Sequence, residues 1–143
     1  MSLERLLKDR VVEKTFPNKN LALKILKLAK RDLKTAKYTL KNEDYDWSLA
    51  IAYNAMLQAG RSLMFSKGYR PYSQYKHVAV IQFVHEVFGK EITDRMVDVF
   101  NRMRKKRHRV VYEEPGIVSE DEAENAIRFA EEFVNKVSEI VEH

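Results

Sequence analysis

Apolar residues recur at intervals of three and four positions through several long stretches of this 143-residue chain. One stretch carries Leu26, Ala29, Leu33, Ala36 and Leu40 on a single side. This period matches the 3.6 residues per turn of an α-helix and does not match the alternation of a strand. Only four glycines and three prolines interrupt the stretches, so we expect an all-α protein.

Breaking and capping residues divide the pattern into six expected helices and no strand. The expected helices are 3–14, 19–40, a segment from a cap at Asp44 or Asp46 to Gly68, 76–88, 92–112 and 119–140. Because the connections are short, neighbouring helices should be antiparallel, which predicts an up-and-down bundle of four to five main helices plus a short one. We expect a single domain, 1–143, to which the helix and turn of 1–17 could be peripheral.

A strongly basic stretch, Arg102–Arg109, lies where the fifth expected helix should bury its apolar side. The apolar positions of that helix are Ile92, Met96, Phe100 and Met103, and the next step of four reaches Arg107. A buried charge without a partner is costly, so Arg107 should have a partner, face a cleft or lie at an interface. The other cations could be a solvated face that complements the negative end of the helix dipole.

The net charge of +5 conceals an asymmetry along the sequence. After Ile117, eight acidic residues oppose two basic ones, so the rest of the chain is markedly basic. A basic body favours polyanionic ligands such as RNA. Alternatively, the acidic last helix packs beside the basic one and neutralises it, and both interpretations can hold.

Several function classes lack their sequence signatures. The chain has no cysteine, which excludes thiolate metal sites and suits a reducing cytoplasm. It shows no H-E-x-x-H, P-loop or G-x-S-x-G pattern, and His77 and His85 are spaced too widely for ligation on adjacent turns. No signal peptide or membrane-length apolar run is visible. We therefore expect a cytoplasmic protein without metal or cofactor and without membrane association.

The segment Gly68–His77 is expected to be a loop in which three tyrosines alternate with cations. In such a loop Tyr72 and Tyr75 could stack on bases while the cations hold phosphates. Alternatively, these tyrosines pack against the end of the bundle and keep their hydroxyl groups in water. His77, at the end of the loop, is expected to be a hydrogen-bonded structural residue.

Three segments, in this order, resemble the HEPN family (higher eukaryotes and prokaryotes nucleotide-binding). They are Ala29–Ala36, Tyr45–Met56 and Arg104–Tyr112, with a glycine-containing loop leading to His77 between the second and third. The resemblance extends from about Leu21 to Ile140. It implies a helical protein that dimerises through these helices and lines up two motifs in one cleft.

The family's motif is an arginine, a polar residue, three further residues and a histidine. The resemblance places Arg107 at the arginine, His108 at the polar residue and Tyr112 at the histidine. Active members are metal-independent ribonucleases, and a tyrosine, with an ordinary pKa near 10, is a poor general base at pH 7. We therefore expect a non-catalytic nucleotide- or RNA-binding module, with Arg104, Lys105 and Arg109 as further phosphate ligands.

A second alignment of the motif pairs Arg102 with His108. On a straight helix, Arg102 and His108 lie about 120° apart and Arg107 and Tyr112 about 140° apart, so either pair would need a helix distortion or a second subunit to converge. The corresponding alternative function is a metal-independent endoribonuclease toxin that uses Arg102 or Arg107 with His108. A purely structural protein whose basic helix docks on an acidic surface is a third possibility.

The resemblance also implies partners. Family members form homodimers, and some are one half of a toxin–antitoxin pair with a small nucleotidyltransferase. We accordingly expect a homodimer, a nucleotide or RNA ligand, and a nucleotidyltransferase partner protein.

Overall fold

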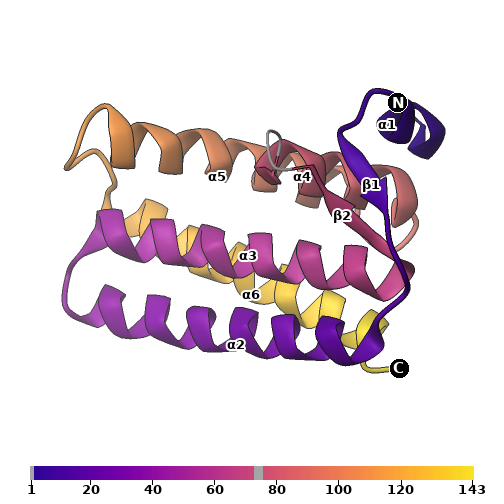
Figure 1. The fold of residues 1–143 in the computed structure, drawn as a ribbon. Coiled ribbons are helices and arrows are strands. Elements are labelled where there is room, and N and C mark those ends of the chain that lie inside the picture. Colours follow the sequence, from indigo (N-terminus) through magenta and orange to yellow (C-terminus); the bar gives the residue numbers. More distant parts are fainter. Residues whose placement is uncertain (1, 73–75) are drawn as a thin grey trace.

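The computed structural model describes residues 2–72 and 76–143, and it confirms the predicted all-α bundle. Four long helices run side by side (Figure 1): α2 (Lys19–Lys41), α3 (Tyr45–Lys67), α5 (Asp94–Tyr112) and α6 (Glu120–Val141). The shorter α4 (Lys76–Val87) precedes α5. No helix in the described ranges combines the length and the apolar character needed to cross a membrane.

Local capping interactions set the helix boundaries close to those predicted. Asp44 caps α3, and Gly68 ends it in the left-handed conformation, with a φ of 87° that disfavours other residues. Ser119 and Glu122 form a capping box at the start of α6, in which each side chain accepts a hydrogen bond from the backbone N–H of the other residue. These signals lie within one helical turn, so sequence alone reveals them.

The N-terminal segment differs from the prediction. The expected helix 3–14 ends early as α1 (Leu3–Lys8), because Arg10 adopts a left-handed conformation with a φ of 56°. The chain then forms β1 (Val12–Lys14), which pairs antiparallel with β2 (Tyr69–Pro71). The prediction of no strand and of a loop at Tyr69 was therefore wrong. Val12 suits a strand because its β-branched side chain packs well on a pleated surface.

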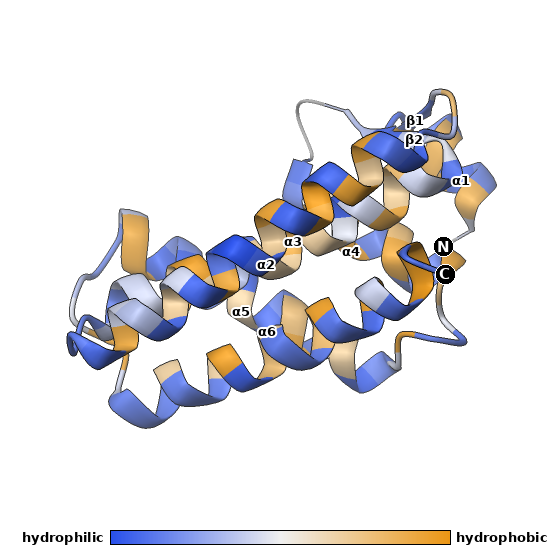
Figure 2. Cartoon of the chain, turned by 90° about the horizontal axis from the view of Figure 1, so that it is seen from below, coloured by the Kyte–Doolittle hydropathy of each residue, from blue (hydrophilic) through white to orange (hydrophobic). Residues whose placement is uncertain are grey.

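Helix α3 lies at the centre of the bundle and contacts α2, α4, α5 and α6. Small residues let α2 approach closely, and two buried serines bond its carbonyl groups: Ser48 Oγ donates to Ala36 O (3.0 Å) and Ser62 Oγ to Ala22 O (2.6 Å). Apolar and polar residues share each long helix (Figure 2), so each helix turns one side inward.

An aromatic series crosses the core from α3 to α6. The ring of Phe100 on α5 lies between those of Tyr53 on α3 and Phe133 on α6, with centroid distances of 5.8 and 5.2 Å. All three side chains are almost completely buried. Leu6 and Val12, from the N-terminal segment, are also fully buried members of this core.

Candidate functional site

Arg107 lines an open pocket of about 350 Å³ between α2, α3 and α5. Its guanidinium shares this pocket with Asp32, Asn54 and Trp47. Asp32 is only 8% exposed, and both of its oxygens already accept hydrogen bonds, from Asn54 Nδ2 (2.9 Å) and Arg31 Nη2 (3.2 Å). Across residues 2–72 and 76–143, no carboxylate lies within ion-pair distance of Arg107. The guanidinium is therefore half-buried, accessible and without a counter-ion in the described part of the chain.

The three motif residues meet at the end of α5. The guanidinium carbon of Arg107 lies 5.8 Å from the centroid of the Tyr112 ring, and the imidazole of His108 lies 4.9 Å from the same ring. Since α5 is a continuous helix through Tyr112, the expectation that Arg107 and Tyr112 need a distortion or a second subunit to meet was wrong. The long arginine side chain spans the angle between them. His108 is exposed, and its Nε2 lies 3.8 Å from Glu113.

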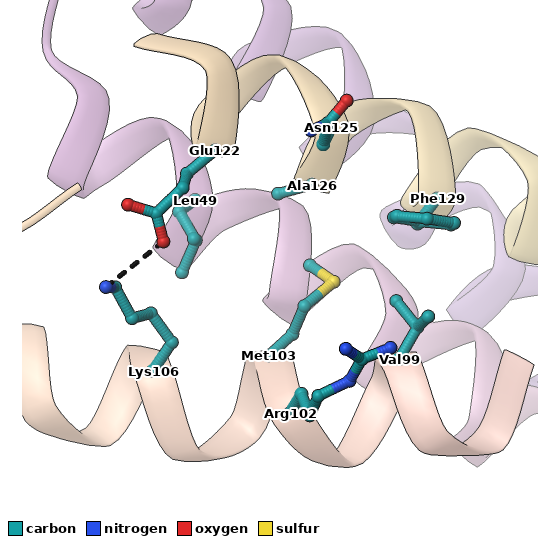
Figure 3. Close-up of a pocket in the computed structure, with 9 residues that line it drawn as sticks. All are labelled: Leu49, Val99, Arg102, Met103, Lys106, Glu122, Asn125, Ala126 and Phe129. Atoms are coloured by element: carbon teal, nitrogen blue, oxygen red, sulfur yellow. Dashed lines mark ion pairs between the residues drawn. The ribbon is translucent and has the colours of Figure 1, made fainter. Parts of the chain in front are cut away.

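Arg102 lies in a different groove, between α5 and α6 (Figure 3). This groove has a volume of about 310 Å³ and a largely apolar lining that includes Met103 and Phe129. At its other end Lys106 forms an ion pair with Glu122 (3.1 Å). Burial alone would raise the pKa of Glu122. Hydrogen bonds from Lys106 and the Ser119 backbone outweigh this effect, so the pKa is lowered overall. Arg102 and His108, both within the described residues, share no hydrogen bond or ring contact.

Comparison with known proteins identifies the family. A family model of the HEPN domain matches residues 22–140, from the start of α2 almost to the end of α6. The chain belongs to the HEPN family. It is also 30% identical, over 118 residues, to a protein of Methanocaldococcus jannaschii named "Putative toxin MJ0605"; the match covers 79% of this chain and 83% of that protein. The family match begins after α1 and β1, so the small sheet pairs one strand outside the matched HEPN region, β1, with one inside it, β2.

The remaining residues predicted to bind a ligand in this HEPN chain are dispersed. Arg104 donates a hydrogen bond to Asn101 (3.1 Å), Arg109 lies 3.6 Å from Glu114, and Lys105 is exposed. Tyr72 is half-buried, and its backbone N–H donates to Val11 O (3.1 Å). Tyr75 lies outside the described residues. The structure thus brings Arg107 and His108 against the Tyr112 ring, whereas Arg104, Lys105 and Arg109, on the same helix, show no such ring contact among the described residues.

A hydrogen-bonded pair between α3 and α4 was only half anticipated. His77 Nδ1 is hydrogen-bonded to the Tyr53 hydroxyl (2.8 Å), and the two rings are stacked at 5.6 Å. Burial lowers the pKa of His77, and the positive charges of Arg107 and Arg104 lower it further. Burial also raises the pKa of Tyr53. Sequence predicted a structural His77 but not its partner, because the two residues come from different helices.

The acidic helix of the HEPN fold neutralises the basic helix only in part. Lys106 on α5 pairs with Glu122, whereas Glu142 pairs with Lys30 on α2 (2.6 Å) and Glu131 with Lys37, also on α2. Most of the α5 cations thus have no ion pair with α6 within the described ranges. No group of three or more histidine, aspartate or glutamate side chains there is placed to bind a metal ion.

Proposed function

We propose that this HEPN chain binds a phosphate-bearing ligand, a nucleotide or RNA, in the Arg107 pocket without cleaving it. One observation carries the proposal: a half-buried guanidinium lines an open pocket and has no ion pair in the described part of the chain. An uncompensated charge in such a place is costly unless an anion meets it. The planar fork of arginine can donate two parallel hydrogen bonds to a phosphate.

The surroundings of Arg107 support the same proposal. Trp47 is 55% exposed and Tyr112 is 66% exposed, so aromatic surfaces on which bases can stack flank the guanidinium. The family resemblance places Tyr112 where active members have their catalytic histidine, and this supports binding without cleavage. Arg104, Lys105 and Arg109 would add attraction for a polyanion along α5.

The proposed active form is a cytoplasmic homodimer, each protomer folding as one domain, 1–143. Exposed apolar side chains at the motif end of the bundle support a second copy as the partner: Trp47, Val111 and Tyr112. A role as the toxin of a toxin–antitoxin pair, with a small nucleotidyltransferase as partner, rests on the family resemblance and on the name of the M. jannaschii relative. Sedimentation velocity of the purified chain tests the dimer.

The ligand-binding proposal is tested by measuring single-stranded RNA and nucleotide affinity as a function of salt. Phosphate contacts predict a steep loss of affinity as salt rises. Arg107→Gln should weaken binding roughly ten- to a hundredfold, the value of one charge-assisted contact. Arg128→Gln removes the same charge from the exposed face of α6 and serves as the control. Equal affinities for the wild type and the Arg107 variant would overturn the proposal.

The second candidate is a metal-independent endoribonuclease that uses Arg102 or Arg107 with His108. The convergence of His108 and Arg107 on one ring favours the Arg107 pairing. Cleavage of single-stranded RNA in EDTA that His108→Ala abolishes would establish this activity. Cleavage by the Arg107→Gln and Arg102→Gln variants then identifies the arginine that acts with His108, because only substitution of that arginine should abolish the activity. If concentrated wild-type protein cuts no RNA, this candidate is eliminated.

A further inference from the structure

A second pocket, of about 410 Å³, lies between α3, β2 and the first turn of α4. Gln58, Arg61 and Phe65 of α3 form one wall, and Lys76 and His77 of α4 form another. The pocket shares no lining residue with the Arg107 pocket. Along α3, Arg61 lies roughly 15 Å from Ile51 of the Arg107 pocket, and the nearest lining residues of the two pockets, Leu57 and Asn54, are about 4.5 Å apart along the helix axis, at 1.5 Å per residue.

Arg61 is the central cation of this pocket. Its guanidinium lies over the Phe65 ring, 5.7 Å from the centroid, and Nη1 donates to Gln58 Oε1 (2.6 Å). The side chain is half-buried, and burial lowers its pKa, although an arginine stays charged at neutral pH. Neither residues 2–72 nor 76–143 place a carboxylate within ion-pair distance of Arg61. The hydrogen bond and the ring fix the guanidinium without neutralising it.

The other charges around the pocket leave it positive. Lys76 stands at the rim and has no ion pair among the described residues, while Arg70 is neutralised by Glu13. His77 is held in place by Tyr53 and also lines the pocket. Burial, followed by the charges of Arg107, Arg104 and Lys76, lowers its pKa. A preorganised guanidinium, an ammonium and an imidazole thus surround this space, and none of the described residues that line it is acidic.

We propose that the Arg61 pocket is a second anion site, which binds a phosphate group. The guanidinium of Arg61 and the ammonium of Lys76 donate to the phosphate oxygens, and the apolar wall of Leu57, Phe65 and Pro71 receives the attached organic part. The phosphate belongs either to a small phosphorylated ligand or to a nucleic-acid strand that follows α3 from the Arg107 pocket. The site does not depend on the function proposed for Arg107.

The test is a titration of the full chain with inorganic phosphate and AMP, followed by backbone-amide NMR. Saturable shifts should centre on α3 around Arg61 and on the first turn of α4. Arg61→Gln should weaken phosphate binding roughly tenfold or more. Lys76→Gln should also weaken phosphate binding, because it removes the second cation of the pocket. Since Lys76 is exposed, this substitution should leave the fold intact. Arg128→Gln is a matched control, because Arg128 Nη1 also bonds an amide three residues earlier, Asn125 (2.8 Å).

Two further arms decide the source of the phosphate and the independence of the site. Arg107→Gln should leave binding of inorganic phosphate at α3 and α4 intact. If Arg61→Gln also weakens binding of a short oligouridylate, the phosphate comes from a strand; if it weakens only AMP, the ligand is small. The proposal is overturned if Arg61→Gln and Lys76→Gln both bind phosphate like the wild type, or if only Arg107→Gln abolishes the shifts.

Discussion

The two sides of helix α3 differ in how completely they are packed. Toward α2 and α6, small residues and buried serines close the interface, and ion pairs such as Lys30–Glu142 join the outer edges. Toward α5, long cationic side chains leave a groove on each side of α5. One, of about 310 Å³, lies next to α6, and the other, of about 350 Å³, lies next to α2. Arg102 and Arg107, one in each groove, have no ion pair within the described part of the chain.

This difference suggests that one side of α3 stabilises the fold and the other side is available for ligand binding. Packed apolar side chains supply most of the free energy of folding, whereas unpaired charges in grooves supply little of it and are available for ligands. Substitutions on the α2–α6 side should therefore change the free energy of unfolding more than affinity, and those in the α5 grooves the reverse. The predictions that follow test this separation.

The largest expected effect is that of Phe133→Ala on α6. Phe133 is fully buried against Phe100, so truncation leaves a cavity that the bundle cannot fill. We expect the free energy of unfolding to fall by about 3–5 kcal/mol, measured by urea denaturation. Phe129→Ala, at a half-buried position beside the α5–α6 groove, is the control and should cost less. Equal losses at the two positions would mean that burial in the core does not set Phe133 apart from a residue at the edge of the groove.

A smaller effect is expected from Asp46→Ala, which removes the hydrogen bonds between the start of α3 and the α5–α6 connection. The Asp46 carboxylate accepts from the backbone N–H groups of Gly116 (2.5 Å) and Val118 (3.2 Å), and so ties the α5–α6 connection to the start of α3. Its loss should cost about 1–2 kcal/mol of unfolding free energy. Asp121→Ala, an exposed first-turn acid of α6, should change it by less than about 0.5 kcal/mol. If affinity for RNA survives Asp46→Ala unchanged, the tether does not position the Arg107 pocket.

Sequence predicted the parts of the structure that local rules determine. The long helices follow from their apolar period, and the cap at Ser119 and the end at Gly68 follow from residues within one turn. Sequence also singled out Arg107, because it interrupts an otherwise regular apolar series, and the structure places its side chain in the pocket between α2, α3 and α5. The β1–β2 pairing was missed, since its partners are more than fifty residues apart and its trigger is the backbone conformation of Arg10.

The site was harder to predict than the fold because pockets assemble from several elements. Asp32 and Asn54 are ordinary polar residues in sequence, and only the approach of α2 to α3 turns them into a hydrogen-bonded wall opposite Arg107. Arg61 likewise looks like an ordinary surface cation in the sequence, and only the folded positions of β2 and α4 show that it lines a pocket. The spacing of Asn54, Gln58 and Arg61, four and three residues apart on α3, was the available signal.

The half-buried His77 should make stability depend on pH. Burial and the neighbouring cations on α5 lower its pKa in the folded chain. Near pH 6.5 the unfolded chain therefore takes up a proton at His77 more readily than the folded chain does, so the free energy of unfolding should fall as the pH drops below that value. His77→Gln should flatten this dependence, measured by urea denaturation across the range, and His85→Gln, at an exposed position near Asp94, is the control variant. An unchanged slope in the His77 variant would contradict the assignment.

The smallest expected effect is at the ion pairs on the outside of the packed side. Lys37 and Glu131 connect α2 to α6, but both side chains are about half exposed, so solvent and salt screen their attraction. Lys37→Gln should change the free energy of unfolding by about 0–1 kcal/mol, and added salt should reduce the difference from wild type. Lys106→Gln on α5 removes the ion pair with Glu122 and gives the corresponding change in the free energy of unfolding for the α5 side. A Lys37 loss that approaches that of Phe133→Ala would mean that charge, rather than the fit of small and aromatic side chains, distinguishes the two sides of α3.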